Sequence, residues 1–165
     1  MELRKWTPKD RDAMVYLGNH VDRTHLTDRL PNPLTDKDAD FWLSMIREQD
    51  GVRAVHRAIW VDGVLVGCIM AEQKADVYGK DAEVGYMLGK EFENRGIMTK
   101  AVSALIPLAF ETLDILRLSA SVNEPNLASR RVLEKNGFQL EGFQKSAVYK
   151  DGTVYNLCQY GLLKP

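Results

Sequence analysis

Cysteine is scarce in this 165-residue chain, and its two copies are not spaced as metal ligands. Cys68 and Cys158 both lie in apolar runs typical of strands. Free Cys side chains are among the most often buried, whereas zinc sites need closely spaced Cys and His. Buried free thiols are therefore the favoured interpretation, with a disulfide or a nucleophile as the alternatives, and the sequence predicts no metal site.

A long hydrophobic run is also missing. No apolar stretch approaches the roughly 18 residues that a transmembrane helix requires. The start, Met1 to Lys5, is polar and has no apolar segment of the kind found in signal peptides. We therefore expect a cytoplasmic protein without a membrane partner.

Neither sign of charge is in excess. The 22 basic and 23 acidic residues give a formal net charge of -1 and a pI of about 6.3. A nucleic-acid-binding surface usually shows a basic excess or stripe, so we expect no nucleic-acid partner. With 45% hydrophobic residues, the chain can bury a core as one globular domain over residues 1–165, as a monomer or a homodimer.

The apolar periodicity and the turn residues predict alternating strands and helices. The predicted strands are 2–7, 55–61, 64–72, 82–88, 117–122, 138–149 and 153–163. The predicted helices are 8–17, 36–49, 97–113 and a short one that runs from an Asn126 cap to about Lys135. Pro107 lies inside the third helix, where we expect a kink, because proline removes a backbone hydrogen bond. The resulting order is β-α-α-β-β-β-α-β-α-β-β.

A turn at residues 93–99 joins a predicted strand to the third helix. Gly96 allows a tight turn, and a helix that begins here would leave backbone N–H groups unpaired in its first turn. These donors and the positive helix end favour an anion such as phosphate, and Arg95 adds a positive charge. An ordinary strand-to-helix connection is the alternative. Gly85, in the preceding strand, indicates either a bulge or a close approach of another backbone or of a ligand.

A second pattern follows one strand later, in residues 126–142. Asn126 follows a proline and is a good N-cap, Ser129 lies three residues further on, and Asn136-Gly137 predicts the helix end. Each device is common, but their position after a phosphate-type turn and one strand is distinctive.

With these two patterns the chain resembles the GNAT superfamily of acetyl-CoA-dependent N-acetyltransferases, most closely the RimJ/RimL-like branch that includes acetyltransferases of ribosomal-protein N-termini. The resemblance implies an α/β (α+β) GNAT fold, with a mixed, mainly antiparallel sheet flanked by helices. The family's Gln/Arg-x-x-Gly-x-Gly/Ala motif falls on residues 93–98. Gly96 matches it, whereas Glu93 and Met98 depart from it.

The resemblance also implies a binding site for acetyl-CoA. Its pantetheine arm would insert beside the strand of residues 82–88, and its pyrophosphate would bind the turn. Backbone donors near Gly85 would stabilise the oxyanion. The residues expected to contact the co-substrate are Met87, Leu88, Arg95, Gly96, Ile97, Met98, Thr99 and Asn126.

The catalytic residues that the resemblance implies are Ser129 and Glu83. Ser129 would supply a proton to the leaving thiolate, unless its hydroxyl bonds to the helix backbone instead. The ribosomal-protein branch has a glutamate in the penultimate strand, but Val148 stands there and cannot accept a proton. Glu83 is then the remaining general base, with a solvated or ion-paired glutamate as the alternative. We also expect the loop of residues 20–32 to wall the acceptor site.

The sequence therefore predicts an acyltransferase that moves acetyl from acetyl-CoA to a primary amine. A protein or peptide N-terminus, or another amine of low pKa, is the preferred acceptor. One alternative is a small-amine acetyltransferase acting on a polyamine or an antibiotic. The other is a non-catalytic module that only binds acetyl-CoA, suggested by Val148 and by the departures at residues 93 and 98.

Overall fold

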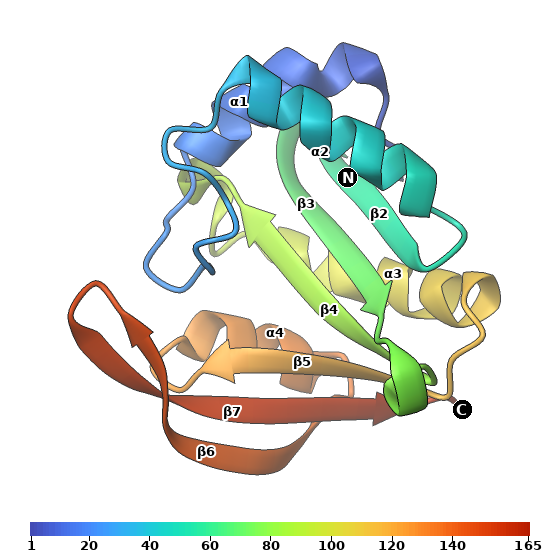
Figure 1. The fold of residues 1–165 in the computed structure, drawn as a ribbon, viewed down its shortest axis with the longest axis vertical. Coiled ribbons are helices and arrows are strands. Elements are labelled where there is room, and N and C mark those ends of the chain that lie inside the picture. The colour runs from blue at the N-terminus through green and yellow to red at the C-terminus, as the bar shows by residue number, and fades with distance from the viewer.

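The computed structural model describes residues 1–165 and contains one seven-stranded sheet (Figure 1). The strands follow the order β1-β2-β3-β4-β5-β7-β6 across the sheet. Every neighbouring pair is antiparallel except β4 and β5, which are parallel. The strand bounds are β1 (Glu2–Arg4), β2 (Ala54–Val61), β3 (Val64–Gln73), β4 (Asp81–Leu88), β5 (Arg117–Asn123), β6 (Gln139–Lys150) and β7 (Thr153–Leu163).

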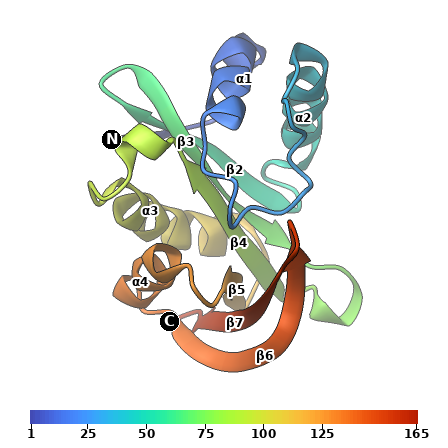
Figure 2. The same cartoon turned by 90° about the vertical axis from the view of Figure 1, so that its left-hand side faces the viewer.

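Four α-helices flank the sheet, two on each face (Figure 2). The helices α1 (Arg11–Asn19) and α2 (Asp36–Gln49) cover one face of β2 and β3. The helices α3 (Ile97–Thr112) and α4 (Leu127–Lys135) lie together on the other face. The order of strands and α-helices is the predicted one, and the mixed, mainly antiparallel sheet is confirmed.

The first two elements differ in extent from the prediction. The first strand ends at Arg4 rather than residue 7, because Thr7 caps a short 3-10 helix, Pro8–Asp10. The backbone N–H of Thr7 donates to the Asp10 carboxylate over 2.7 Å. The predicted helix 8–17 therefore starts as this 3-10 turn and continues as α1 to Asn19. Two further 3-10 helices, Asp76–Tyr78 and Lys90–Phe92, were not predicted.

Local signals account for the positions of the other elements. Thr35 caps α2 and exchanges hydrogen bonds with Asp38, with 2.9 Å from the Thr35 N–H to the Asp38 carboxylate. The helix α3 continues through Pro107 as a single helix. Proline costs a helix roughly 3 kcal/mol. We attribute the continuity to burial, because α3 places seven residues in the core: Ile97, Met98, Ala101, Val102, Leu105, Ala109 and Phe110.

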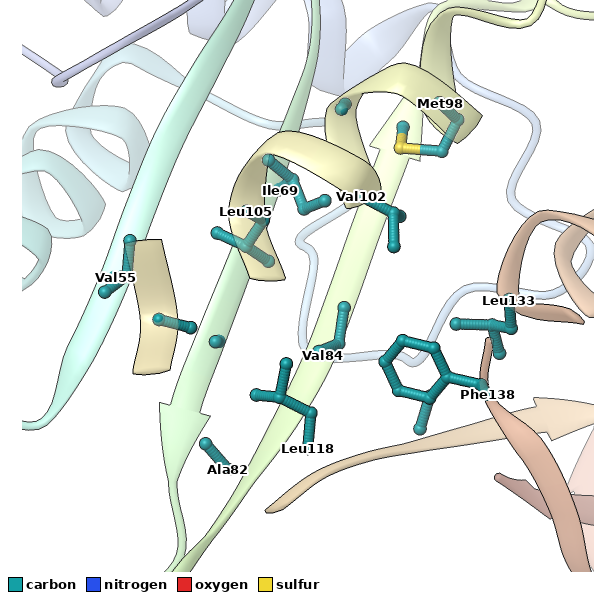
Figure 3. Close-up of a cluster of buried hydrophobic side chains, with 14 of the residues drawn as sticks. Val55, Ile69, Ala82, Val84, Met98, Val102, Leu105, Leu118, Leu133 and Phe138 are labelled. Carbon is teal, nitrogen blue, oxygen red and sulfur yellow. The ribbon is translucent and has the colours of Figure 1, made fainter. Parts of the chain in front are cut away.

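The main core lies between the sheet and the pair α3 and α4 (Figure 3). Val55, Ile69 and Val84 come from three successive strands, and Leu105 of α3 lies over them. Each apolar side chain that leaves water contributes roughly 1.5–3 kcal/mol, so this layer fixes α3 against the sheet. No helix combines the length and the apolar character needed to cross a membrane.

Both cysteines are free thiols, as predicted. Cys158 is buried in the main core. Cys68 lies on β3, where burial raises the pKa of its thiol to about 12. A thiol with so high a pKa stays protonated near neutral pH, which argues against a nucleophilic role for Cys68.

Candidate functional site

The sheet is split between β4 and β5. The two strands pair only over three residues, from Asp81 opposite Arg117 to Glu83 opposite Ser119. Beyond Glu83 they diverge, and residues 84–88 have no strand partner on the β5 side (Figure 1). Unpaired backbone groups on such an edge can pair with an extended ligand, as an added strand would. The split therefore provides a slot for an extended chain in the middle of the sheet.

The loop of residues 20–35 reaches from α1 to the β6–β7 hairpin. The Lys150 ammonium donates to the carbonyl oxygens of Arg23 (2.6 Å) and Leu26. The ring of His25 meets the edge of the Tyr155 ring, with 5.9 Å between centroids. These contacts hold the loop across the open end of the split.

The predicted phosphate turn precedes α3. Gly96 is the N-cap residue, with a φ of 71°, and Asn94 also has a positive φ of 58°. A Cβ built on Gly96 would meet no atom within 4 Å, so the space above this turn is open. Because the side chains of Ile97 and Met98 are buried, only their backbone is available to a ligand. The geometry is that of a helix N-terminus that can bind an anion through backbone N–H groups.

The neighbouring residues differ in what they offer a ligand. Arg95 is exposed, and its guanidinium lies 5.5 Å above the centre of the Phe92 ring. The carbonyl oxygen of Thr99 accepts a hydrogen bond from the Asn136 side chain (3.2 Å), which ties the start of α3 to the end of α4. The turn is therefore anchored by α4 on one side and open to solvent at Arg95.

Gly85 accommodates a side chain rather than a bulge. The pairing of β3 with β4 runs without a register shift, with Gly85 opposite Met70. A Cβ at Gly85 would lie 3.0 Å from the terminal methyl of Met70. The bulge considered at this position is therefore wrong, and the atoms that approach Gly85 belong to the Met70 side chain rather than to another backbone, while the approach of a ligand stays a prediction. Met87 and Leu88 follow on the unpaired edge, and their side chains pack in cores on opposite faces of the sheet.

Ser129 lies at the start of α4, beside β4. Its backbone N–H donates to the side chain of Asn126, the N-cap residue, over 3.1 Å. Its hydroxyl oxygen lies 2.7 Å from the Tyr86 hydroxyl. The Ser129 hydroxyl therefore bonds to a side chain of β4 rather than to the backbone of its own helix. Burial raises the pKa of Tyr86 to about 12, so this phenol is neutral at physiological pH.

Glu83 faces the other side of the sheet. Successive side chains of a strand alternate between faces, so Glu83 and Tyr86, three residues apart, point in opposite directions. Glu83 lines a cavity of about 320 Å³ on the face covered by α1 and α2. Arg29, Arg53, Glu72 and Lys74 also line this cavity. The structure therefore places the two predicted catalytic residues, Glu83 and Ser129, on opposite faces of the sheet at the split.

Within the cavity, the two glutamates lie on neighbouring strands. Glu72 of β3 is directly opposite Glu83 of β4, and neither carboxylate makes an ion pair within 4 Å. Arg29 comes from the loop of residues 20–35, so that loop lines the cavity that contains Glu83. Val148 lies in β6 opposite Tyr155, near the loop, and offers no proton acceptor.

Two parts of this site were missed from the sequence. Tyr86 was not among the predicted site residues, because no local signal connects it to Ser129, 43 residues away. Arg29, Arg53 and Glu72 come from a loop, a turn and a strand that meet only in the folded chain. The alternation of β3 and β4 places Glu72 and Glu83 on one face, but the pairing register was needed to place them opposite each other.

Comparison with known proteins gives a consistent assignment. Residues 1–139 match the model of the acetyltransferase (GNAT) domain family. YdaF of Bacillus subtilis (strain 168), whose name describes it provisionally as a ribosomal N-acetyltransferase, is 36% identical over 123 residues, 74% of this chain. The chain spans 65% of the length of YdaF, and 48% and 58% of two further N-acetyltransferases of that organism.

Solved structures share the whole fold. A crystal structure of a probable acetyltransferase is 31% identical, with a TM-score of 0.84, and the alignment covers 98% of this chain and 92% of that one. RimL, a ribosomal L7/L12 alpha-N-protein acetyltransferase in complex with coenzyme A, has a TM-score of 0.85 at 23% identity, with the same coverage. These likenesses confirm the predicted fold.

Proposed function

The chain belongs to the GNAT acetyltransferase family, and from this premise we propose that it transfers an acetyl group from acetyl-CoA to the α-amine of a polypeptide N-terminus. The divergence of β4 from β5 after Glu83 carries the proposal, because it leaves a slot for an extended chain between Glu83 and Ser129. The names of YdaF and RimL, which refer to ribosomal and alpha-N-protein acetylation, support this acceptor.

We propose that the pantetheine arm of acetyl-CoA lies along residues 84–88 and that the pyrophosphate binds the first turn of α3. The backbone of residues 96–99 supplies N–H donors to the phosphates, and Arg95 adds an exposed positive charge. The backbone of Met87 and Leu88 pairs with the arm, and Asn126 contacts it from α4. This arrangement places the thioester in the split, between Glu83 on one face of the sheet and Ser129 on the other.

In the proposed reaction the amine nitrogen attacks the thioester carbon from the cavity side. Glu83 accepts the proton that the amine loses, directly or through one water. The new C–N bond forms as the C–S bond breaks, and the thiolate leaves on the side of Ser129. The base, Glu83, and the residue that stabilises the leaving group, Ser129, thereby lie on opposite faces of the sheet. The carboxylates of Glu72 and Glu83 therefore do not repel the departing thiolate.

Ser129 then acts on sulfur mainly by hydrogen bonding. A thiol has a pKa of about 8.5, whereas the pKa of Tyr86, the partner of Ser129, is about 12. A complete proton transfer from this pair to the thiolate would be uphill by roughly 3.5 units, or about 5 kcal/mol. We therefore propose that Tyr86 donates to Ser129 and that Ser129 donates to the leaving sulfur, while the final proton comes from solvent.

A peptide comparison tests the proposal. One peptide has a free N-terminus and no lysine, and its counterpart has a blocked N-terminus and one lysine. At pH 7.5 an α-amine of pKa about 8 is roughly one quarter neutral, whereas a lysine of pKa about 10.4 is neutral about one time in a thousand. We expect faster acetylation of the free N-terminus, at a rate that rises with pH through the pKa of the acceptor. Faster acetylation of lysine contradicts the proposed acceptor.

The same assay decides between an enzyme and a binding module. Val148 and the departures at Glu93 and Met98 are the observations that favour a module which only binds acetyl-CoA. Such a module binds the co-substrate and acetylates no amine in a broad amine library. Transfer to any amine excludes it, and transfer to polyamines or antibiotics alone favours the small-amine alternative.

A further inference from the structure

Charged side chains of both signs line the cavity that contains Glu83, and four of them make no ion pair with another residue of the chain. Arg29 and Arg53 make no ion pair within 4 Å, and the same holds for Glu72 and Glu83. Lys74 is different, because its ammonium bonds to Asp81 over 2.7 Å. The cavity therefore has two free guanidinium groups and two free carboxylates on its walls.

The two carboxylates provide a place for an ammonium group. Glu72 and Glu83 lie directly opposite each other on neighbouring strands, where like charges repel and destabilise the pair. A positively charged amine between them relieves this repulsion. Ser119 lies in register with Glu83 on the other side and is only 6% exposed, and its hydroxyl has no hydrogen-bond partner. This hydroxyl is buried and does not line the cavity, so the ammonium site consists of the two carboxylates alone.

The two arginines provide a place for negative charge on the same ligand. Arg29 comes from the loop of residues 20–35 and Arg53 from the turn between α2 and β2, and both side chains are exposed. A guanidinium group binds carboxylates with two parallel hydrogen bonds. Because the arginines lie at the solvent side of the cavity, the rest of a polypeptide chain can leave past them.

Resting on the proposed function, we propose that the preferred acceptor is a peptide N-terminus followed closely by acidic residues. The ammonium group binds at Glu72 and Glu83, and the acidic side chains bind Arg29 and Arg53. Glu83 then has two successive tasks: it holds the ammonium form, and it accepts one proton from it to give the neutral amine that attacks. The second proton, which the nitrogen loses after the C–N bond has formed, goes to solvent, and solvent protonates the departing thiolate.

Three peptides that share an N-terminal serine test this inference. Their next residues are acidic, neutral or basic, and kcat/KM is measured for each. Exposed ion pairs contribute modestly, so we expect the acidic peptide to exceed the neutral one about fivefold to tenfold at low salt. Screening reduces this ratio at high salt. Equal kcat/KM for the acidic and neutral peptides overturns the inference.

Variants assign the preference to the cavity. In R29Q/R53Q the ratio of acidic to neutral peptide should fall to about one, and in R53E it should turn in favour of the basic peptide. Lys37→Gln is the matched control, since Lys37 is an exposed cation on α2 outside the cavity, and it should keep the wild-type ratio. A ratio that survives in R29Q/R53Q overturns the inference.

A failure of the proposed function can be distinguished from a failure of this inference. If no amine is acetylated, calorimetry of the acidic and neutral peptides with the CoA-bound protein still measures the preference, and equal affinities contradict it. Free serine and free aspartate form the last arm of the experiment. A higher kcat/KM for either than for the acidic peptide identifies an amino acid as the acceptor and overturns the inference for peptides.

Discussion

The hydroxyl oxygens of Tyr86 and Ser129 lie 2.7 Å apart, although 43 residues separate them in the chain. The first comes from β4 and the second from the start of α4. The Asn126 side chain accepts a hydrogen bond from the backbone N–H of Ser129 and so fixes the serine backbone, while the Tyr86 phenol holds the serine side chain. This contact orients the one hydroxyl group proposed to meet the leaving sulfur.

Removing either hydroxyl should slow turnover and spare co-substrate binding. A hydrogen bond to a charged group contributes about 1.5–3 kcal/mol, so Ser129→Ala should lower kcat about 10-fold to 150-fold. Tyr86→Phe removes a bond between neutral groups and should lower kcat about threefold to tenfold. The double variant should resemble Ser129→Ala alone, because Tyr86 is proposed to act through Ser129.

Steady-state kinetics and CoA titration measure these effects. Tyr149→Phe is the matched control, since Tyr149 is 75% exposed on β6 and should have no effect on kcat. Wild-type turnover in Ser129→Ala would show that this serine has a structural role only. Additive losses in the double variant would mean that Tyr86 acts independently of Ser129.

Glu83 should be needed for proton removal and not for binding the donor. General bases contribute about 10²–10⁴-fold, so Glu83→Gln should lower kcat in this range with unchanged CoA affinity. The loss should be smaller at high pH, where the acceptor amine is already neutral. A loss that is the same at every pH would assign Glu83 to acceptor binding alone.

We expect CoA binding to require Gly96, because the phosphates are proposed to occupy the open space next to this residue. Asn tolerates a positive φ, so Gly96→Asn should fold while its side chain occupies the proposed phosphate position. Gly63→Asn is the matched control, because the φ of Gly63, 80°, is similar to that of Gly96 and a Cβ built on Gly63 also meets no atom within 4 Å. Calorimetry should give at least a tenfold weaker CoA affinity for Gly96→Asn only. Equal affinities in the two variants would exclude this turn as the phosphate site.

His56 should make the fold sensitive to mild acid. It is 5% exposed, and burial is the main cause that lowers its pKa below the usual 6.5, with Arg57 in the same direction. Asp50 and Glu72 act in the opposite direction. Below pH 6.5 the unfolded chain binds a proton that folded His56 resists, so the free energy of unfolding falls as the pH decreases.

Denaturant unfolding between pH 7.5 and 5 measures this slope, which cannot exceed about 1.4 kcal/mol per pH unit for one group. His56→Gln should flatten the slope in this window, which lies above the range where carboxylates take up protons. His20→Gln changes an exposed histidine and should keep the wild-type slope. An unchanged slope in His56→Gln would assign the acid sensitivity to other groups.

The sequence by itself determined the order and nearly all the bounds of the elements, because these follow from local rules. Apolar periodicity, the Asn126 cap and the glycine turns act within a few residues, and the cap and the turns have the predicted geometry. The main local failure was the first strand, where the Thr7 cap ended a pattern that extended further in the sequence.

Only the tertiary structure decided how the site is assembled. The strand register stops after Glu83, which opens the split, and the packing of α4 against β4 brings Ser129 to Tyr86. The cavity combines a loop, a turn and two strands far apart in the chain. Such contacts depend on register, on strand divergence and on the packing of whole helices, and no residue pattern within a single element specifies them.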